Sequence, residues 1–269
     1  MTLNFTKMNG AGNDFVVLDN RDLSLSLTKE QIASLCDRHR GVGADGLLAV
    51  EPAESGSDFK FRYYNADGGE AEMCGNGARC YGRFAQTLVD GDPEVLTFET
   101  IVGELAAKFD GDLVEIAMAN PFDLELDVDL GIEGINRVDV INTGVPHVVV
   151  YVDDLEATDV QSLGREIRYH QHFAPAGTNV NFASVIGDQH IAIRTYERGV
   201  EGETLACGTG MTACALINNL LEGTGSPIKV DVKGGDTLEI GFTPGPDNSF
   251  TDVTLKGPAD FVFTGQIEI

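Results

Sequence analysis

Cys74-Gly-Asn-Gly77 and Cys207-Gly-Thr-Gly210 are the two stretches of sequence that decide the fold of this chain. A shift of 133 residues, close to half of the 269-residue sequence, carries the first onto the second. The same shift carries the strand-like run 15–18 onto the run 148–151. Self-similarity at a fixed spacing is the signature of repeated structural units. The sequence therefore predicts a duplicated fold.

Each half is expected to contain the same elements around one helix. A helix is predicted from Thr28 to His39, where Gln31 completes a capping box. The helices expected at 78–89 and 211–221 are apolar around most of their circumference, which favours enclosure. Short runs rich in β-branched and aromatic residues surround them in sequence and predict strands. The predicted fold class is α+β: two pseudo-symmetric halves, each a curved, mainly antiparallel sheet wrapped around a central buried helix.

The repeat also predicts the domain limits. Residues 1–118 form the N-terminal half with Cys74, and residues 119–260 form the C-terminal half with Cys207. The last run, 261–269, lies beyond the second repeat and is expected to return as a strand to the first half. An active site is expected in the cleft between the halves.

The composition favours a globular protein with an unusual charge. The chain is 42% hydrophobic and 23% charged, but 18 basic residues face 43 acidic ones, for a net charge of −25. Such a field repels phosphate backbones, so nucleic acid is not an expected partner. The acidic residues are scattered, and by analogy they suggest adaptation to high salt. No apolar run is long enough for a membrane span and no signal peptide is evident, so we expect no membrane partner and a cytoplasmic location.

The five cysteines need individual interpretations. They form no CxxC pair and no His-Cys cluster at zinc spacing, so no disulfide scaffold and no metal site is expected. Cys36, Cys80 and Cys214 lie on apolar helical faces and are predicted to be core residues. Cys74 and Cys207 each precede a glycine-rich helix start.

A thiol at a helix start can serve acid–base chemistry. Unpaired N–H groups and the helix dipole hold a carboxylate there and lower a thiol pKa. Two such turns facing each other would hold one carboxylate and place a sulfur on each face of the adjacent carbon, as stereochemical inversion by proton transfer requires. Two alternatives remain for the cysteines: small residues at glycine-rich helix starts, or a redox pair.

Several further segments, in the same order, resemble the diaminopimelate epimerase family over essentially the whole chain. The matching segments are Gly10-Ala-Gly-Asn-Asp-Phe15, Gly41-Val-Gly-Ala-Asp45, Asn65-Ala-Asp-Gly68, Cys74-Gly-Asn-Gly-Ala-Arg-Cys80, Pro146-His147, Asn179-Val-Asn-Phe182, and Tyr196-Glu-Arg-Gly199 leading to Ala206-Cys-Gly-Thr-Gly210. The resemblance implies interconversion of LL- and meso-2,6-diaminoheptanedioate in lysine biosynthesis. It implies no pyridoxal phosphate, no metal and no other cofactor, and a homodimer.

The resemblance also implies roles for individual residues. The two catalytic residues are Cys74 and Cys207, one acting as thiolate and the other as thiol. The implied substrate-binding residues are Asn13, Asn65, Gly75, Asn76, Asn179, Glu197, Arg198, Gly208 and Thr209. His147 and Glu197 are implied to tune the cysteine pKa values. Arg198 suits the distal carboxylate of the substrate, because a guanidinium binds a carboxylate through two parallel hydrogen bonds.

Two positions depart from the family pattern, and two other functions stay open. Many members have glutamine where Gly46 stands and asparagine where Val145 stands, so neither role is assigned here. One alternative is a proline, hydroxyproline or other amino-acid racemase on the same scaffold. The other is a non-catalytic thiol-redox binding protein.

Overall fold

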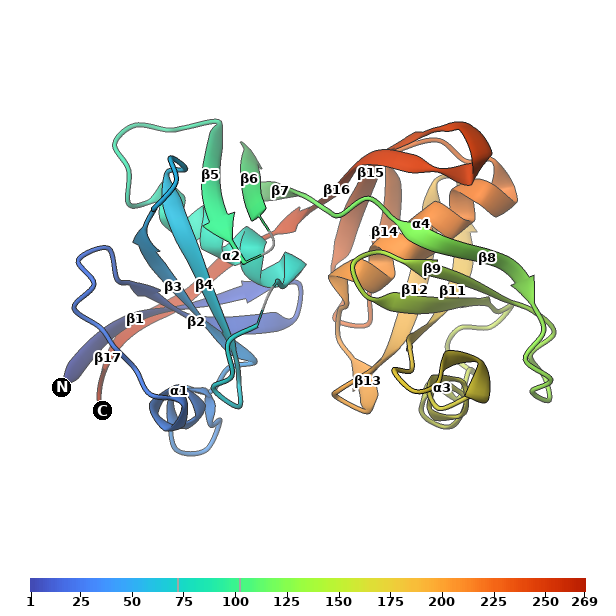
Figure 1. The fold of residues 1–269 in the computed structure, drawn as a ribbon, viewed down its shortest axis with the longest axis horizontal. Coiled ribbons are helices and arrows are strands. Elements are labelled where there is room, and N and C mark those ends of the chain that lie inside the picture. Colours follow the sequence, from blue (N-terminus) through green and yellow to red (C-terminus); the bar gives the residue numbers. More distant parts are fainter. Residues whose placement is uncertain (72, 102) are drawn as a thin grey trace. The chain divides into compact units, whose positions relative to one another are not determined.

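The computed structural model describes residues 1–71, 73–101 and 103–269, which form two compact units (Figure 1). Unit 1 comprises Met1–Ala117 and Gly257–Ile269, and unit 2 comprises Met118–Lys256. Both chain termini therefore belong to unit 1.

In its described residues, unit 1 is a mixed sheet with two helices. Its elements are β1 (Thr2–Gly10), β2 (Asn13–Asp19), α1 (Lys29–Cys36), β3 (Gly46–Pro52), β4 (Phe59–Asn65), α2 (Gly75–Gln86), β5 (Val95–Thr100), β6 (Gly103–Asp110), β7 (Leu113–Ala117) and β17 (Asp260–Glu268). The strands pair in the order β17-β1-β2-β3-β4-β5-β6-β7, and only β2–β3 and β4–β5 are parallel among the pairs described. The last strand of the chain thus lies antiparallel to the first.

Unit 2 repeats this arrangement. Its elements are β8 (Phe122–Val128), β9 (Val138–Asn142), β10 (Pro146–Tyr151), α3 (Val160–Arg168), the 3₁₀ turn η1 (Gln171–Phe173), β11 (Asn179–Gly187), β12 (His190–Glu197), β13 (Gly202–Thr204), α4 (Gly208–Glu222), β14 (Ile228–Asp231), β15 (Thr237–Pro244), η2 (Pro246–Asn248) and β16 (Phe250–Pro258). The order is β8-β9-β10-β11-β12-β14-β15-β16, with the short β13 also on β12.

The two strand orders have the same polarity throughout. In both, the third and fifth neighbouring pairs are parallel and the remaining pairs are antiparallel. The helix α2 contacts every strand from β1 to β7, and α4 contacts β9 to β12, β14 and β15. Each sheet therefore surrounds one central helix, and the predicted fold class is confirmed.

Small residues allow the sheet to approach α2 closely. Gly82 lies on its buried side, where an added Cβ would stand only 2.6 Å from the Cβ of Ala107 on β6. Ala78 and Ala85 are fully or almost fully buried, and the aromatic ring of Tyr81 packs edge-on against Phe61. Helix α4 is also enclosed by its sheet, but its own buried residues are larger. Its Leu216 and Ile217 are fully buried.

The helix limits differ from the prediction in an informative way. The central helices begin earlier than expected, at Gly75 and Gly208, because Cys74 and Cys207 are themselves the N-cap residues with extended backbones. The capping box at Thr28 is present, but α1 ends at Cys36 rather than at His39. It ends there because the chain folds back, and the Val42 N–H donates to the carbonyl of Leu35.

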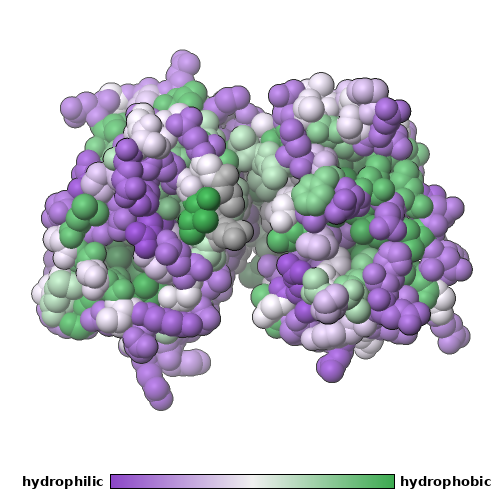
Figure 2. All heavy atoms as spheres, in the orientation of Figure 1, coloured by the Kyte–Doolittle hydropathy of each residue, from purple (hydrophilic) through white to green (hydrophobic). Residues whose placement is uncertain are grey.

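The surface is polar over much of its area. On the face that Figure 2 shows, hydrophilic side chains cover much of each unit, and smaller hydrophobic patches lie among these side chains. Within the described ranges, no helix combines the length and hydrophobicity needed to span a membrane.

Candidate active site

Cys74 caps the helix buried in unit 1. Its Sγ accepts a hydrogen bond from the N–H of Gly77 at 3.4 Å, and its backbone is extended (φ −144°, ψ 116°). The first N–H groups of a helix lack partners within the helix and carry the positive end of its dipole. The Cys74 turn can therefore stabilise an anion on the sulfur or beside it.

Asn13 connects β2 to this turn. Its Oδ1 lies 3.5 Å from the Sγ of Cys74 and 3.5 Å from the Nδ2 of Asn76. Its Nδ2 donates to the carboxylate of Asp45 at 2.8 Å. The structure thus brings together three of the residues predicted for the site, which are Asn13, Cys74 and Asn76.

A network of four charges lies behind Asn13. The Nζ of Lys7 is 2.7 Å from one oxygen of Asp14, and an Nη2 of Arg38 is 2.7 Å from the other. Arg38 is also 2.7 Å from Asp45. Burial alone would raise the Asp14 pKa, but hydrogen bonds and positive charge from Arg38 and Lys7 together lower it well below its usual range. Asp14 is therefore ionised at all ordinary pH values.

Arg79 supports Asn76 from inside the unit. Its side chain is fully buried in the second turn of α2. Its Nη1 donates to Oδ1 of Asn76 at 3.0 Å, and its Nε donates to the carbonyl of Pro258 at 3.2 Å. These contacts fix the Asn76 amide with its oxygen towards Arg79 and its nitrogen towards Asn13.

Asn65 lies at the end of β4 on the same side of the sheet. Strand register places Phe15, Gly46 and Asn65 next to one another across β2, β3 and β4. The hydroxyl of Tyr63 donates to the side-chain oxygen of Asn65 at 2.8 Å. The Asn65 amide is therefore exposed near the start of β2, and the hydrogen bond from Tyr63 fixes its position.

Cys207 caps the helix buried in unit 2. It is 7% exposed, and its backbone is extended (φ −129°, ψ 109°) like that of Cys74. Its Sγ lies 3.6 Å from the hydroxyl of Thr209, and the carbonyl of Thr209 accepts a 2.9 Å hydrogen bond from Thr143. A Cβ added to Gly210 would overlap the side-chain oxygen of Asn181, so β11 packs directly against this turn.

His147 is buried beside this turn as a neutral imidazole. Burial, with a smaller contribution from the positive charge of Arg198, lowers its pKa from 6.5 to about 3. Its Nδ1 lies 3.1 Å from Nδ2 of Asn181, whose oxygen accepts from the hydroxyl of Thr195 at 3.0 Å. At neutral pH, His147 can affect a thiol through hydrogen bonding or polarity, since it carries no charge.

Asn179 and Arg198 meet at the same end of these strands, where the register places Asn179 next to His147. The backbone N–H of Arg198 donates to Oδ1 of Asn179 at 2.8 Å, while Nδ2 of Asn179 donates to the carbonyl of Pro146 at 3.3 Å. The Arg198 guanidinium makes long contacts, 3.4 and 3.5 Å, to the carbonyls of Ala176 and Gly177. Glu197, the last residue of β12, is half-buried next to them. Unit 2 therefore groups His147, Asn179, Glu197 and Arg198 along neighbouring strands.

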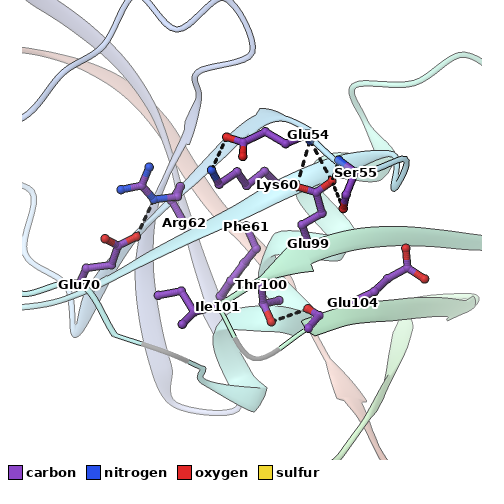
Figure 3. Close-up of a pocket in the computed structure, with 11 residues that line it drawn as sticks. Glu54, Ser55, Lys60, Phe61, Arg62, Glu70, Glu99, Thr100, Ile101 and Glu104 are labelled. Atoms are coloured by element: carbon purple, nitrogen blue, oxygen red, sulfur yellow. Dashed lines mark hydrogen bonds and ion pairs between the residues drawn. The ribbon is translucent and has the colours of Figure 1, made fainter.

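One pocket of unit 1 is lined by residues outside the predicted site. It has a volume of about 480 Å³, and none of the predicted site residues is among its described lining (Figure 3). Lys60 points to Glu54 and Arg62 points to Glu70, each at 2.6 Å, while Glu99 accepts backbone N–H groups of the neighbouring loop. Its cations are thus already ion-paired, and it does not suggest a second ligand site.

Comparison with known proteins decides the family. Residues 5–121 and 140–249 match the family model described as diaminopimelate epimerase, and each segment contains one capped central helix. A diaminopimelate epimerase from Hydrogenobaculum sp. is 44% identical over 278 residues, which cover 97% of this chain and 97% of that protein. The chain belongs to the diaminopimelate epimerase family.

Solved structures with the same architecture are more distant. A PhzF-family phenazine biosynthesis protein from Bacillus anthracis superposes with a TM-score of 0.77 at 15% identity, covering 100% of both chains. A hydroxyproline epimerase from Agrobacterium vitis, with bound trans-4-hydroxy-L-proline, superposes with a TM-score of 0.70 at 18% identity, covering 99% of this chain and 92% of that one. At such identities the likeness shows the shared fold alone.

One departure from the diaminopimelate epimerase pattern has a structural explanation. A Cβ on Gly46 would lie 2.6 Å from the carbonyl oxygen of Tyr64 and 2.9 Å from the ring of Tyr63. In this member of the family the Tyr63 ring therefore occupies the space beside Gly46, and the Tyr63 hydroxyl holds Asn65. Nothing in the structure explains Val145.

Several supporting residues in this diaminopimelate epimerase family member were not predicted from the sequence. Asp45, Arg79 and Asn181 hold predicted site residues through side-chain hydrogen bonds. All three lie inside the segments that resemble the family, and this position was the feature of the sequence that could have identified them. The prediction for the other three cysteines is confirmed: Cys36, Cys80 and Cys214 are buried, and burial raises the pKa of Cys36 to about 11 and that of Cys80 to about 12.

Proposed function

We propose that this chain interconverts LL- and meso-2,6-diaminoheptanedioate in lysine biosynthesis, with Cys74 and Cys207 as the two proton carriers and no cofactor. One observation carries the proposal most directly. Each cysteine is the N-cap of the helix buried in its own unit, at corresponding positions in the two units. Membership of the diaminopimelate epimerase family supports the substrate and the reaction class.

The reaction needs a base and an acid on opposite faces of one α-carbon. One cysteine thiolate removes the α-proton, and the other thiol gives a proton to the opposite face. The intermediate carries negative charge that spreads onto the adjacent carboxylate, where fixed N–H donors stabilise it. We propose that the helix starts at Gly75-Asn76 and Gly208-Thr209 supply those donors.

The distal end of the substrate needs its own contacts. It carries an ammonium and a carboxylate, which suit amide oxygens and a guanidinium respectively. We assign the carboxylate to Arg198 and the ammonium groups to Glu197 and the amides of Asn13, Asn65 and Asn179. His147, neutral and buried, and Glu197 are proposed to tune the cysteine pKa values.

We also propose three wider properties of the protein. The family resemblance suggests a homodimer, and the exposed run Phe261–Phe263 on β17 offers an apolar surface for it. The net charge of −25 suggests adaptation to high salt. The family's biosynthetic role suggests that the enzyme acts in the cytoplasm.

Deuterium exchange tests the reaction and the substrate together. In deuterated buffer with reductant and salt, the protein should introduce deuterium at the α-carbon of LL-diaminopimelate and form the meso isomer. Cys74→Ala and Cys207→Ala should each lower epimerisation by about 1,000-fold or more, since each lacks the proton carrier on one face.

Cys36→Ala is the matched control and should keep its activity, because Cys36 lies in the core of unit 1. Near-normal epimerisation by either of the other alanine variants would remove that cysteine from the mechanism. Turnover of proline or hydroxyproline in place of diaminopimelate would support a racemase of another substrate class.

A further inference from the structure

The turn between β12 and β13 has an unusual backbone at Glu201. The two strands are antiparallel neighbours with Glu197 opposite Gly202, so residues 198–201 form the whole turn. Glu201 has a φ of +57°, in the left-handed region that favours glycine and asparagine. A glutamate in this conformation lowers the stability of the turn. Such an outlier points to a function for the side chain.

The Glu201 carboxylate connects the turn to helix α3. Its Oε1 accepts a hydrogen bond from the backbone N–H of Gly199 at 3.1 Å and another from Nη2 of Arg168 at 3.1 Å. Its Oε2 accepts from the hydroxyl of Tyr196 at 3.3 Å. Burial alone would raise the Glu201 pKa, but hydrogen bonds from Gly199 and Tyr169 and the charge of Arg168 together lower it. The carboxylate is therefore ionised at neutral pH.

Arg168 is held closely between this carboxylate and a neighbouring loop. It is the last residue of α3, and its side chain is only 12% exposed. Its guanidinium donates to the carbonyl of Ala176 at 3.4 Å and lies 4.6 Å from the centre of the Tyr169 ring. A Cβ added to Gly177 would overlap the Arg168 Nη1. The ion pair with Glu201 therefore neutralises a charge that is largely removed from water.

Arg198, the first residue of the turn, is fixed by the peptide groups on both sides of its Cα. The peptide group before the Cα donates its N–H to Oδ1 of Asn179 at 2.8 Å. The peptide group after the Cα contains the N–H of Gly199, which donates to Glu201. Because peptide groups are planar, fixing both of them fixes the φ and ψ of Arg198. The direction in which its side chain leaves the backbone thus depends on Glu201 as well as on Asn179.

The Arg198 guanidinium contacts carbonyl groups rather than a carboxylate of the described residues. Its Nη1 lies 3.4 Å from the carbonyl of Ala176 and 3.5 Å from that of Gly177. Arg168 donates to the same Ala176 carbonyl. Two guanidinium groups therefore meet at Ala176, and Glu201 neutralises the one that belongs to Arg168. The charge of Arg198 is left to bind an anion.

We propose that Glu201 is a positioning residue for recognition of the distal carboxylate of the substrate. It fixes the turn that directs Arg198, and it neutralises Arg168, which would otherwise repel Arg198 and compete with it for the carboxylate. The inference rests on the proposed function, in which Arg198 binds this carboxylate. It adds a residue that touches no substrate and yet determines the affinity for a substrate with a second carboxylate.

The variant Glu201→Gly separates this role from a purely structural one. Glycine adopts a positive φ without strain, so a residue that served the turn alone could be replaced by glycine without loss of activity. Under the proposal, the variant releases the Gly199 N–H and leaves Arg168 unpaired beside Arg198. The KM for LL-diaminopimelate should then rise about tenfold with kcat within about twofold of the wild type, because the lost contact binds substrate and transition state alike.

Val200→Gly is the matched control. Val200 is 61% exposed, so a glycine there gives the same turn added flexibility without removing a contact of Glu201. This variant should keep the wild-type KM. An equal rise in KM in the two glycine variants would show that flexibility of the turn is the cause and would overturn the proposal. An unchanged KM in Glu201→Gly would overturn it as well.

A second measurement needs no substrate and separates this inference from the proposed function. Hydrogen exchange of the Arg198 backbone N–H, followed by NMR, reports how often its bond to Asn179 opens. This exchange should be about tenfold faster in Glu201→Gly than in the wild type and nearly unchanged in Val200→Gly. Equal rates in the wild type and Glu201→Gly would overturn the proposal. A protein that shows the difference but does not epimerise diaminopimelate would reject the proposed function alone.

Discussion

The side-chain nitrogen of Asn181 lies 3.1 Å from Nδ1 of His147, inside unit 2. The same nitrogen donates to the carbonyl of Val148 at 2.9 Å, and the Asn181 oxygen accepts from Thr195. The amide orientation is thus fixed, so Nδ1 of His147 is the acceptor and the neutral ring carries its proton on Nε2. A proton on Nδ1 would face the Asn181 NH₂ group.

The buried His147 should make stability depend on pH. Its pKa is about 3 in the folded protein, against the ordinary histidine value of 6.5 in the unfolded chain, so between these limits the unfolded chain binds the proton and the folded chain does not. The contribution of neutral His147 to the free energy of unfolding is then fully present above pH 6.5. It is lost as the pH falls, by about 2 kcal/mol between pH 8 and pH 5. His147→Gln should remove this loss, as measured by urea unfolding at both pH values.

The control for this effect is His39→Gln, because His39 is exposed after α1. That variant should show the same loss as the wild type. The pH range from 8 to 5 also separates the effect of His147 on stability from that of Asp14. The lowered pKa of Asp14 affects stability only as the pH falls below about 4. A His147→Gln variant with undiminished acid sensitivity between pH 8 and 5 would contradict the assignment of His147 as the buried neutral group.

The corresponding glycines of the two turns should respond differently to alanine. A Cβ on Gly77 would meet its neighbours at 3.4 Å, which is ordinary contact, whereas a Cβ on Gly210 would overlap the Asn181 oxygen. Gly77→Ala should be neutral or slightly stabilising, since alanine favours helix. Gly210→Ala should cost about 1–3 kcal/mol in the free energy of unfolding, as overpacking does. Equal effects on denaturant midpoints would show that Asn181 does not pack against the Cys207 turn.

The repeat in the sequence was enough to predict the duplicated fold, because a shift of 133 residues matches Cys74 to Cys207, and each of them caps the central helix of its unit. The glycine-rich helix starts after Cys74 and Cys207 are confirmed, but the ranges 78–89 and 211–221 left out the first helical residues. Glycine has a low intrinsic helix propensity, but here the cysteine cap and close packing outweigh it.

Side-chain partners were harder to predict than topology. Asn181 contacts His147 and Thr195 only because β10, β11 and β12 are neighbours in one register. Arg79 was not predicted as a supporting residue, because the apolar helix around it indicated only burial. A buried arginine needs hydrogen-bond acceptors, and here one of them is the carbonyl of Pro258, far away in the sequence. Such pairings depend on tertiary arrangement, which a single sequence does not specify.

The acidic surface should make stability increase with salt. Self-repulsion at a net charge of −25 destabilises the compact state, and added ions screen it. The Tm should therefore rise between 0.1 and 2 M KCl. Neutralising the exposed acids of β8 with Asp123→Asn and Glu125→Gln should raise the Tm at low salt and reduce the gain at high salt. The charge-conserving Asp123→Glu with Glu125→Asp is the control, and a gain that is the same in all three proteins would exclude self-repulsion as the cause.

The ion pair behind Asn13 should show strong energetic coupling. Lys7 and Asp14 are 2.7 Å apart, with side-chain exposures of 7% and 19%. Asp14→Asn leaves the Lys7 charge buried without its carboxylate and should cost about 3 kcal/mol or more in the free energy of unfolding. Lys7→Met should cost less, because Asp14 keeps Arg38 as a partner. In the double variant neither charge of the pair is left alone, so its cost should fall short of the sum of the single costs by about 1–3 kcal/mol. Urea unfolding of the four proteins measures this coupling, and additive costs would show that the pair contributes nothing specific to the support of Asn13.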